Sequence, residues 1–405
     1  MKHLLWLARV GLGEREKPGA PTIWNTIEGY IAAGWKVWIL DAGTSEDTPL
    51  GERDYGDGLV IFRFNPPFLA QSRIRKLGWF FQLAQVFYIQ RRLIREADRV
   101  IRDHGLSGQN TVVYGAEVTA ARAARTISLR YGMPLVTRFY GTTMYPVPCT
   151  LFNRLRCFPH YQGLAVPADL VIMTNDGTRG DQVLDRVGNK SPRVFWRNGV
   201  DLPKQEDVGA LPVDCTPGDR LLVTLSRLNR WKHVDRAVAA MPKVLSAHPE
   251  ARLLVIGYGP EQEALSRLAR KLGVSDRVSF TGQIPHSAAC SYLWRAEIFL
   301  SFYDLSNLGN PLMEAMCCGC PVVTLNVGGT DTVITDGVNG LLLPPTELER
   351  RIPEAIIRLL DDDELRTRLS EAAGRYAREN FWTWDERIRT EIRTVEALLP
   401  PGEER

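Results

Sequence analysis

The chain has 405 residues, of which 44% are hydrophobic and 24% are charged. This composition is typical of a globular protein of about two to three domains and excludes a disordered or fibrous chain. No stretch contains the roughly 18 consecutive apolar residues of a membrane-spanning helix. Residues 1–8 have too short an apolar core for a secretory signal, so we expect a cytoplasmic protein.

The formal net charge of +3 conceals an unequal distribution along the chain. Residues 1–198 contain 26 Lys and Arg against 17 Asp and Glu, a balance of +9. Residues 199–405 contain 24 against 30, a balance of −6. Residues 58–95 and 118–168 contain no acidic residue. A surface of one sign attracts anions such as phosphates, acidic glycans and anionic lipids.

Short apolar runs alternate with segments of helical periodicity, which predicts parallel sheets made of β-α-β units. The predicted strands are 4–8, 37–40, 60–64, 112–114, 135–139, 170–174, 194–196, 221–225, 253–256, 278–281, 298–302, 322–325 and 341–343. So many strands exceed one sheet of ordinary size, and residues 199–219 are rich in Pro and Gly. We therefore predict an α/β protein with two Rossmann-like domains, residues 1–198 and 199–382.

The seven cysteines do not form a disulfide framework in a chain of this length. Cys317, Cys318 and Cys320 lie close together, but no histidine stands nearby at zinc-ligand spacing. We interpret this cluster as a packed turn and predict no metal site.

Ligands of open parallel sheets bind beyond the carboxyl ends of the strands, so the residues that follow each strand are the candidates. The first strand is followed by a loop with Gly11 and Gly13, which is compatible with a phosphate cradle and with a plain loop. Glu117 follows the strand at 112–114. It is a candidate acceptor-side base, and an ordinary loop carboxylate is the alternative.

In the second half, Arg227 and Lys232 follow a strand at a strand-to-helix junction, where a phosphate would lie. A solvated surface is the alternative for such a pair. Further along, Asn310 is a suitable N-cap and Pro311 a suitable first helical residue. Glu314 then lies in the first turn, where it either complements the helix dipole or accepts hydrogen bonds from sugar hydroxyls.

Several short motifs together resemble the family 4 glycosyltransferases, the group 1 glycosyl transferases, over nearly the whole chain. The matching residues are Asn198-Gly199-Val200-Asp201, Ser226-Arg227-Leu228 with Lys232, Glu314-Ala315-Met316, Gly319-Cys320-Pro321-Val322-Val323, Gly328-Gly329-Thr330 and Asp336-Gly337-Val338-Asn339-Gly340. The resemblance implies a GT-B fold, with two domains facing across a cleft and a C-terminal helix, residues 383–400, that returns to the first domain.

The resemblance also implies retaining, metal-independent transfer of a sugar from a nucleotide-diphosphate sugar, without a cofactor. Arg227 and Lys232 would hold the pyrophosphate, Glu314 the ribose and Ile284 the base. The remaining donor contacts would come from Gly11, Gly13, Gly257, Ser306, Asn307, Gly309, Asn310, Pro311, Leu312 and Gly329. The first domain would bind the acceptor, with Glu117 as its candidate base and Tyr140 and Arg138 as contacts.

Two positions depart from the family pattern. Ser306 stands where the family commonly has the first of two glutamates, which puts donor identity and activity in question. Tyr140 replaces a histidine, and a phenol with an ordinary pKa of about 10 is a poor base, so we expect a hydrogen-bonding or stacking role.

The expected acceptor is a glycan or a lipid-diphosphate-linked sugar of surface polysaccharide or glycoconjugate synthesis. Residues 68–95 mix basic and aromatic residues, which favours peripheral contact with an anionic membrane. The alternative is a helix that buries its aromatic residues. A nucleotide-sugar binder that has lost transfer activity is a second hypothesis for the function. A nucleotide-sugar epimerase or NAD-dependent oxidoreductase is disfavoured, because Asp41 is the only hint of its ribose-binding acid.

Overall fold

The computed structural model describes residues 1–10, 12, 21–43, 50–66, 78–202 and 218–401. Its chain forms two compact units. The first unit comprises Met1–Asn175, Arg179–Asn198 and Trp384–Arg405, and the second comprises Asp176–Thr178 and Gly199–Thr383. Among the described residues, no helix combines the length and hydropathy needed to span a bilayer.

The first unit contains an eight-stranded sheet in the order β3-β4-β2-β1-β5-β6-β7-β8. Its strands are β1 (Lys2–Ala8), β2 (Trp35–Asp41), β3 (Gly51–Asp54), β4 (Leu59–Arg63), β5 (Thr111–Ala116), β6 (Leu135–Phe139), β7 (Leu170–Thr174) and β8 (Arg193–Trp196). Only β3 pairs antiparallel with its neighbour. The strands in the centre are apolar along their length because the sheet is buried on both faces.

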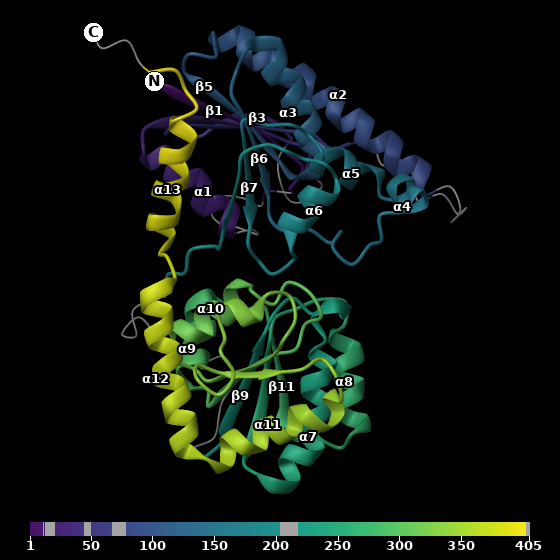
Figure 1. The fold of residues 1–405 in the computed structure, drawn as a ribbon, viewed down its shortest axis with the longest axis vertical. Coiled ribbons are helices and arrows are strands. Elements are labelled where there is room, and N and C mark those ends of the chain that lie inside the picture. The colour runs from purple at the N-terminus through teal and green to yellow at the C-terminus, as the bar shows by residue number, and fades with distance from the viewer. Residues whose placement is uncertain (11, 13–20, 44–49, 67–77, 203–217, 402–405) are drawn as a thin grey trace. The chain divides into compact units, whose positions relative to one another are not determined.

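Helices cover both faces of this sheet (Figure 1). They are α1 (Pro21–Ala32), α2 (Gly78–His104), α3 (Glu117–Tyr131), α4 (Leu151–Arg156), α5 (Phe158–Leu164), α6 (Gly180–Arg186) and α13 (Trp384–Glu396). Leu5 and Leu7 of β1 join the core beneath α2 and α3, whereas Leu4 and Trp6 join the core beneath α1 and α13. This alternation follows from the two-residue period of a strand.

The second unit contains a six-stranded parallel sheet in the order β11-β10-β9-β12-β13-β14. Its strands are β9 (Arg220–Leu225), β10 (Ala251–Ile256), β11 (Val278–Gly282), β12 (Ile298–Ser301), β13 (Val322–Leu325) and β14 (Leu341–Leu343). Its α-helices are α7 (Val234–Ala247), α8 (Gln262–Lys271), α9 (His286–Arg295), α10 (Asn310–Cys317), α11 (Leu348–Asp361) and α12 (Asp363–Asn380). The described residues of this unit also include the short 3-10 turns η3 (Arg230–Lys232), η4 (Ser275–Arg277) and η5 (Thr330–Thr332). Helices α7 and α11 cover one core, and α9, α10 and α12 cover the other.

The structure confirms the predicted fold class and every predicted strand. The additional strand is β3, whose four residues are Gly, Glu, Arg and Asp. Because β3 is a short, charged edge strand, it has none of the apolar periodicity on which strand prediction depends. The C-terminal helix, predicted for 383–400, is observed as α13 and belongs to the first unit.

Candidate nucleotide-sugar site

The loops after β9 to β13 all leave the carboxyl edge of the second sheet, because its strands are parallel. Close backbone approaches join these loops to one another. A Cβ at Gly257 would lie 1.9 Å from the carbonyl oxygen of Ser226, and Gly257 has a φ of +126°. Gly257 is therefore required for the packing of the β10 loop against the β9 loop. Its predicted donor contact stays a prediction.

The loop after β9 carries Arg227 and Lys232. Arg227 is exposed, whereas Lys232 ends η3 and is half-buried. The ammonium nitrogen of Lys232 lies 4.0 Å from the ring centroid of Trp231 and 3.9 Å from that of Tyr303. Tyr303 is buried, and its hydroxyl donates to the carbonyl oxygen of Leu225 at 3.1 Å. Cation–π attraction thus holds the ammonium group at the end of β9.

An ionic network supports the turn that carries Lys232. His233 has a left-handed φ of 47° between η3 and α7. Its Nε2 lies 2.8 Å from Oδ2 of Asp304, and Nη1 of Arg236 lies 2.6 Å from Oδ1 of the same residue. Asp304 therefore fixes the turn from the loop that follows β12.

Burial first, and then the positive charge of Arg227, lower the pKa of Lys232 to about 7, while Asp176 opposes the shift. A bound diphosphate would add negative charge and raise this pKa again. Nucleotide binding is therefore expected to take up a proton at neutral pH. Between pH 7 and pH 9 we expect affinity to fall by up to about 50-fold, because the protonated fraction falls from about half to about one hundredth. Calorimetry across this range, with Lys232→Met as the control that loses the dependence, measures the effect.

Glu314 lies in α10 and is buried. Its Oε1 is 3.2 Å from Nε2 of His286, at the start of α9. Hydrogen bonds to Cys290 and then to Glu314 raise the pKa of His286 to about 10, so the imidazole is charged at neutral pH. Glu314 thus has a charged partner in His286. It is the fifth residue of α10, whose first turn contains no acidic residue, so the expectation that Glu314 lies in the first turn is wrong.

We expect Glu314→Gln to lower the pKa of His286, because the neutral amide no longer favours the imidazolium form. Titration of the His286 ring protons by NMR measures the change. Cys290→Ser is the companion variant, since it removes only the thiol contact. An unchanged pKa in Glu314→Gln would show that the ion pair does not form.

The segment between β12 and α10 is shaped by one aspartate. Ser306 has a φ of 60°, and its Oγ donates to Oδ2 of Asp176 at 2.8 Å. Leu308 N donates to the carbonyl oxygen of Asp176 at 3.2 Å. The Asn307 side chain is fully buried and donates to the carbonyl oxygen of Tyr303 at 2.7 Å. A carboxylate therefore lies next to Ser306, although it comes from another part of the chain.

Helix α10 begins one residue before the predicted start. Gly309 is its N-cap and Asn310 its first residue, so the expectation that Asn310 caps the helix is wrong. Leu312 N donates to the carbonyl oxygen of Gly309 at 3.2 Å. The extended conformation of Gly309 fulfils the role of the cap without a side chain. The donor contacts of Gly309, Asn310, Pro311 and Leu312 stay predictions.

Two other predicted donor contacts lie in the same unit. Gly329 has a φ of 79° at the start of η5. A Cβ added at this position would lie 3.5 Å from Cδ1 of Leu308. Ile284 follows β11 and is partly buried against the core under α9 and α10. Their predicted contacts with the donor stay predictions.

In the first unit, Gly11 and Gly13 lie outside the described residues. Asp41, at the end of β2, is fully buried, and its carboxylate accepts hydrogen bonds from Val10 N at 3.2 Å and Leu12 N at 3.1 Å. These bonds give Asp41 a role in holding the loop after β1.

Glu117 begins α3 with a left-handed φ of 67°, a conformation that is strained for a non-glycine residue. Its Oε1 accepts a hydrogen bond from Tyr140 N at 3.0 Å. Burial raises the pKa of Tyr140 above its ordinary value, so the phenol does not act as a base at neutral pH. The structure thus brings Glu117 and Tyr140 together; the role of Glu117 as a base stays a prediction.

Arg138 is a residue of β6, and its side chain is 1% exposed. Its guanidinium carbon is 4.8 Å from the Tyr140 ring centroid. It shares a buried polar cluster with Arg387 and Glu391 of α13: Nη2 of Arg387 lies 2.9 Å from Glu391 Oε2, and the Tyr114 hydroxyl donates to Glu391 Oε1 at 2.6 Å. This cluster ties α13 to β5. Arg138 therefore lies in the interior, and its predicted acceptor contact stays a prediction.

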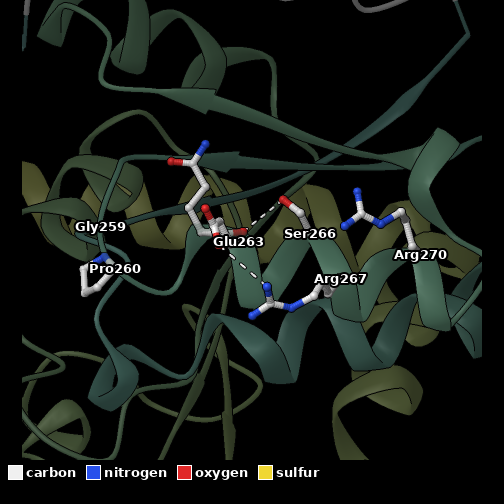
Figure 2. Close-up of a pocket in the computed structure, with 7 residues that line it drawn as sticks. Gly259, Pro260, Glu263, Ser266, Arg267 and Arg270 are labelled. Atoms are coloured by element: carbon white, nitrogen blue, oxygen red, sulfur yellow. Dashed lines mark hydrogen bonds and ion pairs between the residues drawn. The ribbon is translucent and has the colours of Figure 1, made fainter.

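A hollow of about 600 Å³ lies beside α8 in the second unit (Figure 2). It begins at Gly259 and Pro260 and continues along the helix to Arg270. Arg267 and Glu263 in its wall are exposed and 3.6 Å apart. Exposed ion pairs of this kind contribute little to stability. None of the predicted site residues lines the hollow.

Sequence reasoning missed Asp176, Trp231, His286 and Tyr303. A signal existed for two of them. Trp231 directly precedes the predicted Lys232, and Tyr303 directly follows a predicted strand. Asp176 and His286 lie 130 and 28 residues from their partners, so no local pattern links them.

Residues 215–376 match the family model described as glycosyl transferases group 1. A GDP-mannose-dependent alpha-(1-6)-phosphatidylinositol monomannoside mannosyltransferase from Mycobacterium tuberculosis is 31% identical over 303 residues, which are 71% of this chain and 75% of that protein. The chain belongs to the group 1 glycosyl transferases.

Other relatives of this group 1 glycosyl transferase match over less of their length. The uncharacterized glycosyltransferase MJ1069 of Methanocaldococcus jannaschii is 29% identical over 57% of this chain and 59% of that protein. A GDP-mannose-dependent mannosyltransferase for monoacylated alpha-(1-6)-phosphatidylinositol monomannoside, from Corynebacterium glutamicum, is 34% identical over 42% of this chain and 45% of that protein. The chain thus spans about half the length of these two relatives.

Solved structures confirm the GT-B fold class. Sucrose-phosphate synthase from Thermosynechococcus elongatus matches with a TM-score of 0.76 at 19% identity and covers 98% of this chain and 99% of that chain. Alr3699/HepE from Anabaena, in complex with UDP and glucose, matches with a TM-score of 0.70 at 18% identity and covers 97% of this chain and 100% of that chain. At these identities the likeness concerns the fold.

Proposed function

We propose that this protein is a retaining, metal-independent glycosyltransferase that moves a sugar from a nucleotide-diphosphate sugar. The observation that carries the proposal is the pair of cations after β9, with Lys232 fixed between two aromatic rings. Glu314 is on a helix that starts from the same edge of the second sheet. We assign donor binding to the second unit, residues 199–382, with the pyrophosphate at Arg227 and Lys232 and the ribose at Glu314.

Breaking the bond between the sugar and the diphosphate leaves additional negative charge on the leaving oxygen. Arg227 and Lys232 would stabilise this charge more strongly in the transition state than in the ground state, and Lys232 is held in place before the reaction by Trp231 and Tyr303. For the configuration to be retained, the acceptor hydroxyl must form its bond to the anomeric carbon on the face from which the diphosphate departs. The hydroxyl gives up its proton in this step, and Glu117 is the candidate base. We expect transfer to continue in EDTA.

We further propose that the first unit binds a glycan or lipid-linked acceptor of surface polysaccharide or glycoconjugate synthesis, in peripheral contact with an anionic membrane. The positive balance of residues 1–198 supports an anionic acceptor. Two relatives act, by their names, on phosphatidylinositol mannosides. The sugar is a hexose or an N-acetylhexosamine, since the relatives include mannosyltransferases and an N-acetyl-alpha-D-glucosaminyl L-malate synthase.

The second candidate function is nucleotide-sugar binding without transfer. It is favoured by Ser306, whose hydroxyl is engaged by Asp176 and which offers no carboxylate of its own. Tight donor binding without turnover would support this alternative. Donor hydrolysis or transfer that Arg227→Ala abolishes would exclude it.

A thermal-shift panel of UDP-, GDP- and ADP-sugars tests the proposed donor site. At about one hundred times Kd, the correct donor is expected to raise the melting temperature by roughly 5–10 °C. Arg227→Ala should remove the shift. No shift with any nucleotide sugar would contradict the proposal.

A further inference from the structure

Helix α4 in the first unit exposes large apolar side chains to solvent. Leu151 is 75% exposed, Phe152 is 70% exposed and Leu155 is 62% exposed. No residue of α4 is buried. Single exposed apolar residues are ordinary, but three on one six-residue helix form a patch of the kind that marks an interaction site.

The chain holds this short helix in a defined position. Oγ1 of Thr150 caps it by accepting a hydrogen bond from Asn153 N at 3.2 Å. The Asn153 side chain donates to the carbonyl oxygen of Pro148 at 2.9 Å. Nη1 of Arg186 donates to the carbonyl oxygens of Tyr145 at 3.1 Å and Val147 at 2.9 Å. These bonds show that the apolar side chains are presented by an ordered segment.

Helix α2 also exposes aromatic and basic side chains. Phe87 and Tyr88 are exposed, and Arg91 and Arg95 follow at helical spacing and are also exposed. The Phe87 ring lies 6.5 Å from that of Phe158 at the start of α5, the helix directly after α4. Helix α5 contacts both α4 and α2. We call these residues the α4 surface: Phe87, Tyr88, Arg91, Arg95, Leu151, Phe152, Arg154, Leu155 and Arg156.

All charges on the α4 surface are positive. Arg154 and Arg156 are exposed beside the apolar residues of α4. Within the described part of the chain, none of the four arginines of this surface forms an ion pair. The nearby acidic residue of α2, Glu96, is buried and pairs with Arg92 and Arg99 instead. Residues 118–168 contain no acid that could neutralise the patch.

We propose that the α4 surface docks on an anionic lipid bilayer. Leu151, Phe152 and Leu155 would enter the boundary between headgroups and acyl chains, while the arginines meet lipid phosphates. Every charge on this surface is positive, which complements the negative potential of an anionic bilayer. The inference rests on the membrane contact proposed above and assigns a surface to it.

Sedimentation with vesicles, in the absence of donor and acceptor, tests the inference. We expect the protein to bind vesicles of phosphatidylcholine with phosphatidylglycerol, to bind phosphatidylcholine alone weakly, and to dissociate as salt rises. The variant F152S/L155S should bind at least about tenfold more weakly. The variant R154E/R156E should lose the preference for phosphatidylglycerol.

Leu129→Ser is the matched control, because Leu129 is 67% exposed but lies on α3 outside the α4 surface. It should bind vesicles like the wild type. All three variants should keep the wild-type melting temperature, since the changed side chains are exposed. Absent binding to phosphatidylglycerol vesicles, or equal losses in F152S/L155S and Leu129→Ser, would overturn the proposal. A concentration-dependent dimer that F152S/L155S abolishes would assign the surface to a second copy and would also overturn it. Because no nucleotide sugar is present, failure here leaves the proposed transfer reaction untouched.

Discussion

Replacing Lys232 by methionine is expected to lower kcat/KM for the nucleotide sugar roughly 100- to 1,000-fold. Methionine can occupy the space between Trp231 and Tyr303, so the variant removes the charge and keeps the apolar contacts. The loss should appear in KM, because the ammonium group contributes to donor affinity, and also in kcat, because the same group acts on charge that develops as the glycosidic bond breaks. Steady-state kinetics with the donor found in the thermal-shift panel measure it.

Lys243→Met provides the matched control, since Lys243 is exposed on α7, the helix that follows the same turn. It should leave both kinetic constants within about twofold of the wild type, as expected for an exposed side chain away from any site. If Lys232→Met retained full activity, the diphosphate would have to bind elsewhere. Arg227→Ala would then distinguish two cases. Retained activity would indicate that the diphosphate binds elsewhere, and lost activity would indicate that Arg227 alone is sufficient to bind it.

Glu391→Leu is expected to lower the free energy of unfolding of the first unit by about 3–5 kcal/mol. Glu391 is 1% exposed and is the carboxylate partner of Arg387 within the α13 cluster. Its loss leaves Arg387 and Arg138 buried with uncompensated charge, and it removes the acceptor of the Tyr114 hydroxyl. Chemical denaturation followed by tryptophan fluorescence measures the change.

The same helix supplies the control. Asp385 and Arg389 form an exposed ion pair on α13. Asp385→Asn should therefore lower the free energy of unfolding by less than about 0.5 kcal/mol. Burial raises the pKa of Glu391, but Arg387 and Arg138 outweigh this and keep it below the ordinary value. The stability that Glu391 contributes is therefore fully present above the pKa that this carboxyl has in the unfolded chain. It is lost as the pH falls through the pKa of the same carboxyl in the folded chain. Equal losses in the two variants would contradict the role of the buried cluster.

Much of the fold could be predicted because buried parallel strands are continuously apolar. The runs at 170–174, 322–325 and 341–343 are strands with the predicted limits. The short strand β3 has no such run, and the start of α10 depends on the backbone of Gly309 rather than on a capping side chain. Helix and strand boundaries that depend on backbone conformation are difficult to predict from residue type.

The candidate site was predictable in its positions and not in its contacts. Parallel topology places the residues after β9 and β12 at one edge, so Arg227, Lys232 and the start of α10 could be named. The rings around Lys232, the imidazole at Glu314 and the carboxylate at Ser306 come from segments far apart in the chain. Such contacts depend on loop paths and side-chain packing, which a strand pattern does not determine.

The return of α13 to the first unit has a consequence for synthesis on the ribosome. Residues 384–396 complete a unit whose sheet begins at residue 2, so this unit cannot be completed until α13 has been synthesised. The second unit can close while that half is still incomplete. Translation that stops before residue 391 would release a chain in which Arg138 has lost its carboxylate counter-charge, and we expect quality-control proteases to remove it.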